Sequence, residues 1–348
     1  MATLTQTAQT TRRAIKIGII GIVVLVVLKF GWDFSRDVWK RLRPPPPPPP
    51  TVAFGKMPAL KFPEKETPQL SYQLETIQGS LPDFADTGRV YFMPKEPPNL
   101  LALDRAKEQA RRMGFNTQPE LIEGSRYRWT TNTTPPTILE MEINSGNFHY
   151  RYQYENDQEL LVQKNLPTDE QAAQETKKFL QNNGLLTEDL ATGSAEIDYL
   201  RYQPPDLVSA VSLSEADFVR VNLFRADLDG LRILPPNPKE ALISFLFSGN
   251  RESSKRILEI YYYYFPIDFN TSATYPLKPI NNAWQELQGG QGYLANLGQN
   301  EEQIVIRKIY LAYYDSKEPQ HFLQPIYVFE GDNDFFAYVP AIAAEWRE

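Results

Sequence analysis

Ile138-Leu-Glu-Met-Glu-Ile-Asn-Ser-Gly-Asn-Phe-His-Tyr-Arg-Tyr-Gln-Tyr154 is the stretch that decides the fold class. In its second half, aromatic residues occupy alternate positions: Phe148, Tyr150, Tyr152 and Tyr154. This period of two predicts a β-strand with one buried face and one solvated face. Asn144-Ser-Gly146 separates that strand from an apolar run at residues 138–143 and favours a tight turn. We therefore expect an antiparallel hairpin.

Similar stretches recur along the rest of the chain and predict further strands. They are residues 195–202, 217–225, 241–247, 256–265, 303–314, 323–330 and 335–339. Their spacing and their aromatic and β-branched content are typical of antiparallel sheet with one buried face.

Helices are predicted from apolar spacing together with start and stop signals. Residues 100–113 carry apolar side chains three and four apart, between the cap residue Asn99 and Gly114. A second helix begins at the capping-box pair Thr168 and Gln171 and ends before Gly184. A third, shorter helix follows Pro279.

These elements predict an α+β fold in two lobes, each a curved antiparallel sheet packed by helices. About 280 residues are enough for two such units. We place the first lobe at residues 70–205 and the second at residues 206–348.

The amino-terminal region has a different character. Residues 1–13 are a polar tail, and residues 14–32 are apolar enough to predict a transmembrane helix in contact with the lipid bilayer. A cleavable signal peptide has a similar centre, but Lys29, Phe30 and Trp32 stand where its small-residue cleavage site belongs. We therefore expect an uncleaved anchor.

Residues 33–69 form a basic juxtamembrane segment and a proline-rich linker that contains seven consecutive prolines, Pro44 to Pro50. In polyproline II geometry these make a stiff spacer of about 20 Å. A ligand for a proline-binding module is the rival interpretation.

The orientation of the anchor is argued from charge and composition. Five basic residues follow the apolar run and three precede it, a count that favours a cytoplasmic location for the large domain. The spacer and the absence of cysteine from 348 residues favour the other side. We take the domain to be extracytoplasmic on a single-pass cell-membrane protein.

Charge excludes one class of partner. Residues 1–50 hold eight Lys or Arg and two Asp, so the overall net charge of −7 leaves about −13 on residues 51–348. An acidic domain of this kind is a poor nucleic-acid binder.

The order of helix, strand, hairpin and strand resembles the PepSY type of small extracytoplasmic domain. The carboxyl-terminal pieces Ala283-Trp-Gln-Glu-Leu287, Leu311-Ala-Tyr-Tyr314 and Leu323-Gln-Pro-Ile-Tyr-Val-Phe329 resemble the last lobe of the YycH/YycI-like regulators. The resemblance implies a single-pass bacterial protein whose outer domain modulates a membrane sensor kinase. That family has no active-site residues to carry over, and the proline spacer is not part of its pattern.

The inventory of reactive side chains indicates no catalytic site, cofactor or metal. His149 and His321 are the only histidines, and hydrolase, zinc and phosphate-loop motifs are absent from the sequence. Asp227-Leu-Asp-Gly230 and Glu330-Gly-Asp-Asn-Asp334 space oxygen ligands as calcium loops do. Both lack the later glutamate, and we interpret them as turns. Gly289-Gly-Gln-Gly292 follows a helix and is interpreted as its end.

The best candidate binding residues are aromatic. In Tyr261-Tyr-Tyr-Tyr-Phe265, a strand would direct Tyr261 and Tyr263 to one face, and Tyr262 and Tyr264 to the other. Tyrosine is favoured at recognition surfaces because its ring is large and rigid and carries a hydroxyl. A core strand whose hydroxyls reach water is the simpler interpretation.

The sequence thus favours a non-catalytic, membrane-anchored binding or regulatory module with an unknown protein or peptide partner. Two alternatives stay open. One is an envelope hydrolase with a carboxylate pair, which requires two carboxyl groups about 5–10 Å apart. The other is a structural component of an envelope or secretion assembly.

Overall fold

The computed structural model describes residues 18, 25–26, 28–36, 49–64, 68–95, 97, 99–161, 163–299 and 303–348. The chain divides into two compact units, residues 1–49 and 50–348. Most of the predicted anchor at residues 14–32 and most of the proline run lie outside the described residues. Residues 28–36 are helical and solvent-exposed. Within the described part of the chain, no helix combines the length and the apolar character needed to cross a membrane.

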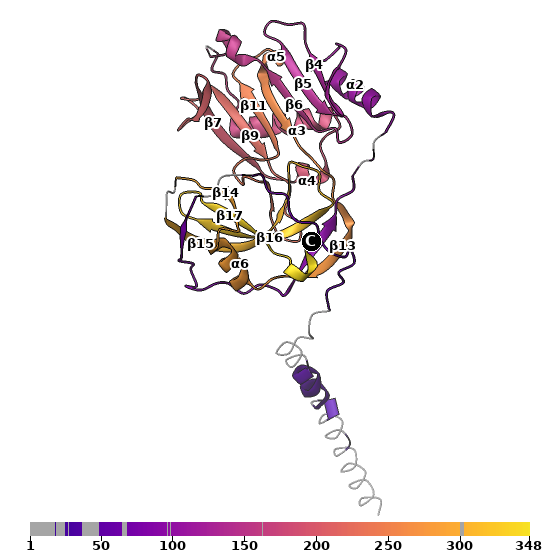
Figure 1. The fold of residues 1–348 in the computed structure, drawn as a ribbon, viewed down its shortest axis with the longest axis vertical. Coiled ribbons are helices and arrows are strands. Elements are labelled where there is room, and N and C mark those ends of the chain that lie inside the picture. The colour runs from indigo at the N-terminus through magenta and orange to yellow at the C-terminus, as the bar shows by residue number, and fades with distance from the viewer. Residues whose placement is uncertain are drawn as a thin grey trace, which may run out of the picture. The chain divides into compact units, whose positions relative to one another are not determined.

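In the described residues, the larger unit contains a nine-stranded antiparallel sheet (Figure 1). Its spatial order is β3 (Glu120–Glu123), β4 (Arg126–Thr130), β5 (Thr137–Glu142), β6 (Phe148–Tyr152), β12 (Ile257–Tyr262), β11 (Ile243–Ser248), β9 (Phe218–Leu223), β7 (Ala195–Gln203) and β8 (Asp206–Ser209). This sheet is the core of the first lobe.

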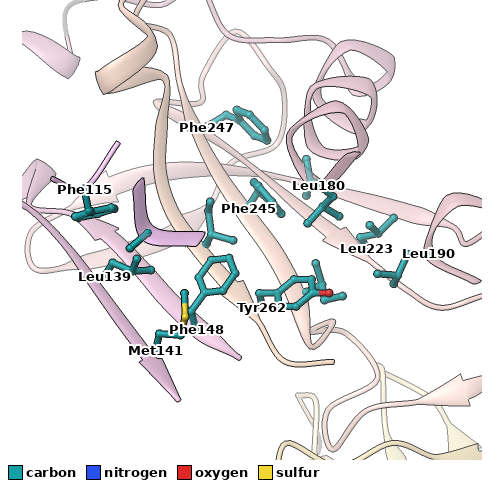
Figure 2. Packing of buried hydrophobic residues seen from close by; sticks show 14 of the residues in the cluster. Phe115, Leu139, Met141, Phe148, Leu180, Leu190, Leu223, Phe245, Phe247 and Tyr262 are labelled. Carbon is teal, nitrogen blue, oxygen red and sulfur yellow. The ribbon is translucent and has the colours of Figure 1, made fainter. Parts of the chain in front are cut away.

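Helices cover one face of this sheet, which we call the inner face. They are α2 (Ala102–Arg112), α3 (Asp169–Asn182) and the short α4 (Glu188–Ala191). Figure 2 shows Leu180 of α3 beside Phe245 and Leu223 of the sheet, in one continuous apolar cluster. The short α5 (Ser253–Arg256) lies between β11 and β12. Burial of the inner face is the main source of stability of this lobe.

The second sheet has eight strands among the described residues and is mainly antiparallel. Its central path is β1 (Ser71–Leu74), β15 (Gln303–Tyr314), β16 (Phe322–Gly331), β17 (Phe336–Pro340) and β14 (Tyr293–Asn296). Joined to that path are β10 (Ile233–Leu234), β2 (Thr87–Phe92) and β13 (Asp268–Pro276). β15 pairs in parallel with β1 and β10.

Both faces of the second sheet are covered. α6 (Ile280–Gln288) packs Ala283 and Leu287 into an apolar cluster with β15, β16 and β17. On the other face, Leu60 and Phe62 pack against a second cluster, with the Phe62 ring centroid 4.7 Å from that of Tyr293. Part of the predicted linker at residues 33–69 therefore belongs to the fold of this lobe. The remaining helical pieces are 3₁₀ turns at Tyr154–Asn156, Gln158–Leu161 and Ala344–Trp346.

The predicted α+β class with two curved antiparallel sheets is confirmed, and so are the three helices predicted within the large domain. The Thr168 side chain accepts from the Gln171 amide, and the Gln171 side chain accepts from the Thr168 amide, as a capping box requires. The hairpin at Asn144-Ser-Gly146 is also present, with Gly146 at φ +74°. These elements depend on local sequence signals, which explains why they were predictable.

The order of the strands along the chain does not follow the division into two sheets. The predicted division after residue 205 falls in the turn between β7 and β8 of the first sheet. β1 and β2, which come before the first sheet in the chain, pair with strands of the second sheet. Pairing between strands more than 170 residues apart is set by tertiary packing, which no local pattern encodes.

Candidate functional site

The tyrosine run separates into core and surface residues. Tyr262 is buried on the inner face, where its ring stacks on Phe148 with centroids 5.3 Å apart. Its hydroxyl donates to the Leu185 carbonyl at 3.1 Å. Burial raises the pKa of Tyr262, so the phenol stays neutral. Tyr262 is thus a core residue, in agreement with the simpler interpretation.

Tyr261 lies on the opposite, outer face of the sheet. Its ring stacks on His149 with centroids 4.2 Å apart and planes 5° apart, and Tyr263 follows at 6.3 Å. His149 Nε2 is 3.0 Å from Oε1 of Glu259. Burial, reinforced by the Glu259 carboxylate, raises the pKa of Tyr261 to about 12. The outer face therefore offers neutral phenols beside an ionised glutamate.

Strand register places polar side chains of the outer face in a continuous row. The row runs across seven strands through Arg128, Glu140, His149, Tyr261, Ser244, Asn222 and Glu196. The row contains one arginine and two glutamates, and Arg128 bonds Glu140 at 2.6 and 2.9 Å, while Ser244 and Asn222 in its middle are buried. Mixed charge of this kind matches a protein surface better than a polyanion.

Tyr263 and Tyr264 line two cavities that share Glu142, and the larger of the two has lining residues from both lobes. Tyr263 lines one of about 130 Å³, with Arg126, Glu140 and His149. Tyr264 and Phe265 line the other, of about 260 Å³. Its further lining residues are Pro94, Lys95, Glu142, Asn144, Ser145, Pro266 and Pro319. We call these two cavities together the tyrosine crevice.

The two carboxylates of the tyrosine crevice, Glu142 and Glu140, already accept hydrogen bonds from neighbouring side chains. Burial by itself would raise the pKa of Glu142, but hydrogen bonds from Ser125, Ser145 and Asn144 outweigh it and lower the pKa. Glu140 is paired with Arg128. A general acid needs a carboxyl whose pKa is raised, so Glu142 is unsuited to the carboxylate chemistry of a glycoside hydrolase.

The other candidate groups occupy structural positions. His321 Nε2 lies 3.1 Å from Lys95 Nζ in an exposed loop. Asp229 accepts from Arg89 and, at 2.6 Å, from the Tyr91 hydroxyl. Both acidic loops are turns with left-handed residues, and Gly290 closes α6 at φ +74°. Across the described residues, no group of three or more His, Asp or Glu side chains is arranged to hold a metal ion.

Sequence reasoning did not find a further cavity, which has a volume of about 820 Å³. It lies on the inner side of the first lobe, and we call it the α2–α3 groove. Its lining comes from the end of α2, from Phe179 of α3, from β5 and β6, and from the β4–β5 and β11–β12 connections. These segments span residues 112–257, which explains why no local signal marked the groove.

Comparison with known proteins adds little to this geometry. No model of a known protein family matches the chain, and no curated protein matches it. Among solved structures, it is similar to an uncharacterized protein from Eubacterium rectale ATCC 33656, at 13% sequence identity and a TM-score of 0.42. That similarity covers 75% of this chain and 85% of the other. A likeness this distant carries no inference about function.

Proposed function

We propose that this chain is a non-enzymatic, membrane-anchored binding module whose tyrosine crevice receives a segment of a protein or peptide partner. The observation that supports it is the convergence of Tyr263, Tyr264 and Phe265 on two neighbouring cavities, the larger of which lies at the junction of the lobes. Junctions between compact units are preferred places for binding sites. Aromatic side chains supply contact area there at little entropic cost.

The two cavities differ in chemistry, which indicates what the partner segment presents. The larger one is lined by prolines and by Tyr264 and Phe265, and its 260 Å³ suits one or two apolar side chains. The smaller one places Arg126 and His149 beside two glutamates and suits a polar group. A partner loop with an apolar anchor next to a polar residue satisfies both cavities.

Anchoring and location are part of the same proposal and rest on the sequence. Residues 14–32 would hold the protein in the membrane, and the proline run would keep the domain clear of the surface. A regulatory role toward a membrane sensor rests on the resemblance of the carboxyl-terminal lobe to the YycH/YycI-like regulators.

Site-specific photocrosslinking tests the tyrosine crevice. p-Benzoylphenylalanine replaces Ser145, an exposed residue of the crevice, in the full-length protein in intact cells. Ser214, exposed in the connection between β8 and β9, is the matched control position. We expect one discrete crosslinked product from position 145 alone, and a weaker product when Pro319→Trp fills the larger cavity. Equal products from both positions, or none from either, would contradict the proposal.

Protease accessibility of the large domain in intact cells tests the location. Cleavage from outside, with a cytoplasmic control protein left intact, is the expected result. Protection until lysis would place the domain on the cytoplasmic side and remove the sensor-ectodomain interpretation, whatever the crosslinking result.

A further inference from the structure

The α2–α3 groove has an aromatic floor and a rim rich in hydroxyl groups. Tyr150 and Phe179 are half-buried at its floor, and the ring of the buried Phe115 meets Tyr150 edge-on at 5.9 Å between centroids. Exposed hydroxyl side chains stand along the rim at Thr133, Thr134, Ser253 and Ser254. The volume of about 820 Å³ lies in the range of small-molecule sites.

Two of the cations that line the groove are already neutralised. Arg256 forms a bidentate pair with Glu175 at 3.0 and 2.8 Å, and donates to the carbonyls of Asn165 and Ser248. Lys255 lies 2.8 Å from Asp157 and 3.6 Å from Glu159. An anionic ligand would have to displace these carboxylates.

Two charged groups at the rim are more open. Arg112 is half-exposed and reaches Glu108 only at 3.9 Å, beyond hydrogen-bond distance. Glu252 is exposed in the β11–β12 connection that lines the groove. One group donates and the other accepts, so together with the hydroxyls they match a ligand that is both donor and acceptor and carries no net charge.

The floor strands disfavour an extended peptide. β5 and β6 are both interior strands of the sheet, in the order β4-β5-β6-β12, so their backbone groups are paired on both sides. A peptide in the groove could not add a strand, which is the usual source of main-chain affinity for extended segments.

We infer that the α2–α3 groove binds a neutral saccharide chain. A pyranose ring has an apolar face of C–H groups that packs on aromatic rings, while its hydroxyls donate and accept at the ring edge. The half-buried rings of Tyr150 and Phe179 supply the first contact. Hydrogen bonds to the sugar hydroxyls come from the threonine and serine side chains, Arg112 and Glu252. This site is separate from the tyrosine crevice and does not depend on the function proposed for it.

The inference is tested with the full-length protein in a zwitterionic detergent, because detergents with sugar head groups would compete. Chitotetraose, cellotetraose and maltotetraose are titrated by calorimetry, beside dodecanoate and inorganic phosphate as anionic probes. We expect saturable binding of at least one tetrasaccharide, and no competition with it from either anion.

Variants locate the site. Ser254→Trp places a large side chain at the rim without touching the core, and we expect it to weaken saccharide binding at least tenfold. Ser80→Trp, at an exposed serine of the second lobe, is the matched control and should bind as the wild type does. Thermal unfolding of both variants shows that each is folded.

Three results would overturn the inference. They are no tetrasaccharide binding up to 10 mM, equal binding by Ser254→Trp and the wild type, and saturable binding of dodecanoate or phosphate in place of the saccharides. If Ser254→Trp does not fold, Thr133→Trp, at another exposed lining residue of the groove, replaces it in the same comparison.

Discussion

Arg225 and Asp315 form a buried ion pair that joins the two lobes: Nη1 of Arg225 lies 3.3 Å from Oδ2 of Asp315, and each side chain is only 6% exposed. Arg225 follows β9 of the first sheet, and Asp315 follows β15 of the second. Arg225 also donates to Asp189 at 2.7 Å and lies over the Tyr264 ring at 4.6 Å. Two carboxylates thus share one guanidinium. Burial raises the pKa of Asp315, although the nearby guanidinium opposes the shift.

Replacement of Arg225 by methionine should destabilise the protein by about 3–5 kcal/mol, because it leaves Asp189 and Asp315 buried without a cation. The free energy of unfolding, measured with urea, checks this value. Arg201→Met, at an exposed position of β7, is the matched control and should change stability by less than about 0.5 kcal/mol. A loss under about 1 kcal/mol for Arg225→Met would show that the ion pair does not hold the lobes together.

The capping box of α3 makes its own contribution to the free energy of unfolding, independent of the Arg225 ion pair. Thr168→Ala removes the acceptor of the Gln171 amide and should cost about 1 kcal/mol. Thr168→Asp keeps a side-chain acceptor at the same position and should stay close to the wild type. Urea denaturation of the three proteins tests both expectations, and equal losses in the two variants would contradict the role of the cap.

Asp157 should make stability depend on pH. Burial would raise its pKa, but Lys255 at 2.8 Å and the Tyr152 hydroxyl at 2.7 Å outweigh burial and lower the pKa. A lowered folded-state pKa means that this contribution is complete above the unfolded value of about 3.9 and disappears as pH falls through the folded value. Asp157→Asn should therefore be about 1.5–3 kcal/mol less stable at pH 7. Its difference from the wild type should shrink below about pH 4. A constant difference from pH 7 to pH 3 would show that the charge of Asp157 is not responsible.

Core and surface tyrosines should respond differently to truncation. Tyr262→Ala removes a ring that stacks on Phe148 inside the first lobe and should cost about 3–5 kcal/mol. Tyr263→Ala removes a half-buried ring on the outer face and should cost less than half of that, while it abolishes crosslinking from position 145. Thermal and urea unfolding compare the two variants. Equal destabilisation would mean that Tyr263 is a core residue as well.

Sequence patterns predicted elements whose cause is local. The capping box at Thr168, the turn at Gly146 and the nine predicted strand stretches all appear in the structure, because each depends on side chains within a few residues. The other strands were missed, among them the two-residue β10 and the irregular β13, neither of which shows a clear period of two. The β3–β4 hairpin had a usable signal in Gly124, which adopts φ +55° at its turn.

The tyrosine crevice was predictable only in part. The run at Tyr261 identified the right segment, but alternation could not tell that Tyr262 packs in the core and that Tyr264 turns toward Arg225. The predicted alternation holds, with Tyr263 beside Tyr261 and Tyr264 beside Tyr262. Which of the two faces is the core depends on the apolar cluster that covers it, and this cluster is formed by residues far apart in the chain. The α2–α3 groove left no trace in the sequence, because its walls come from segments up to 145 residues apart, from Arg112 to Ile257.

By itself, the sequence determined the α+β class, the positions of most strands and helices, and the contrast between a basic apolar amino terminus and an acidic large domain. Helix caps, tight turns and strand alternation act over a few residues, and net charge depends on composition alone. Only the tertiary structure decided which strands share a sheet, how Arg225 ties the lobes together and where the cavities lie. Those features depend on contacts between residues far apart in the chain, and such contacts form only when apolar faces pack against one another.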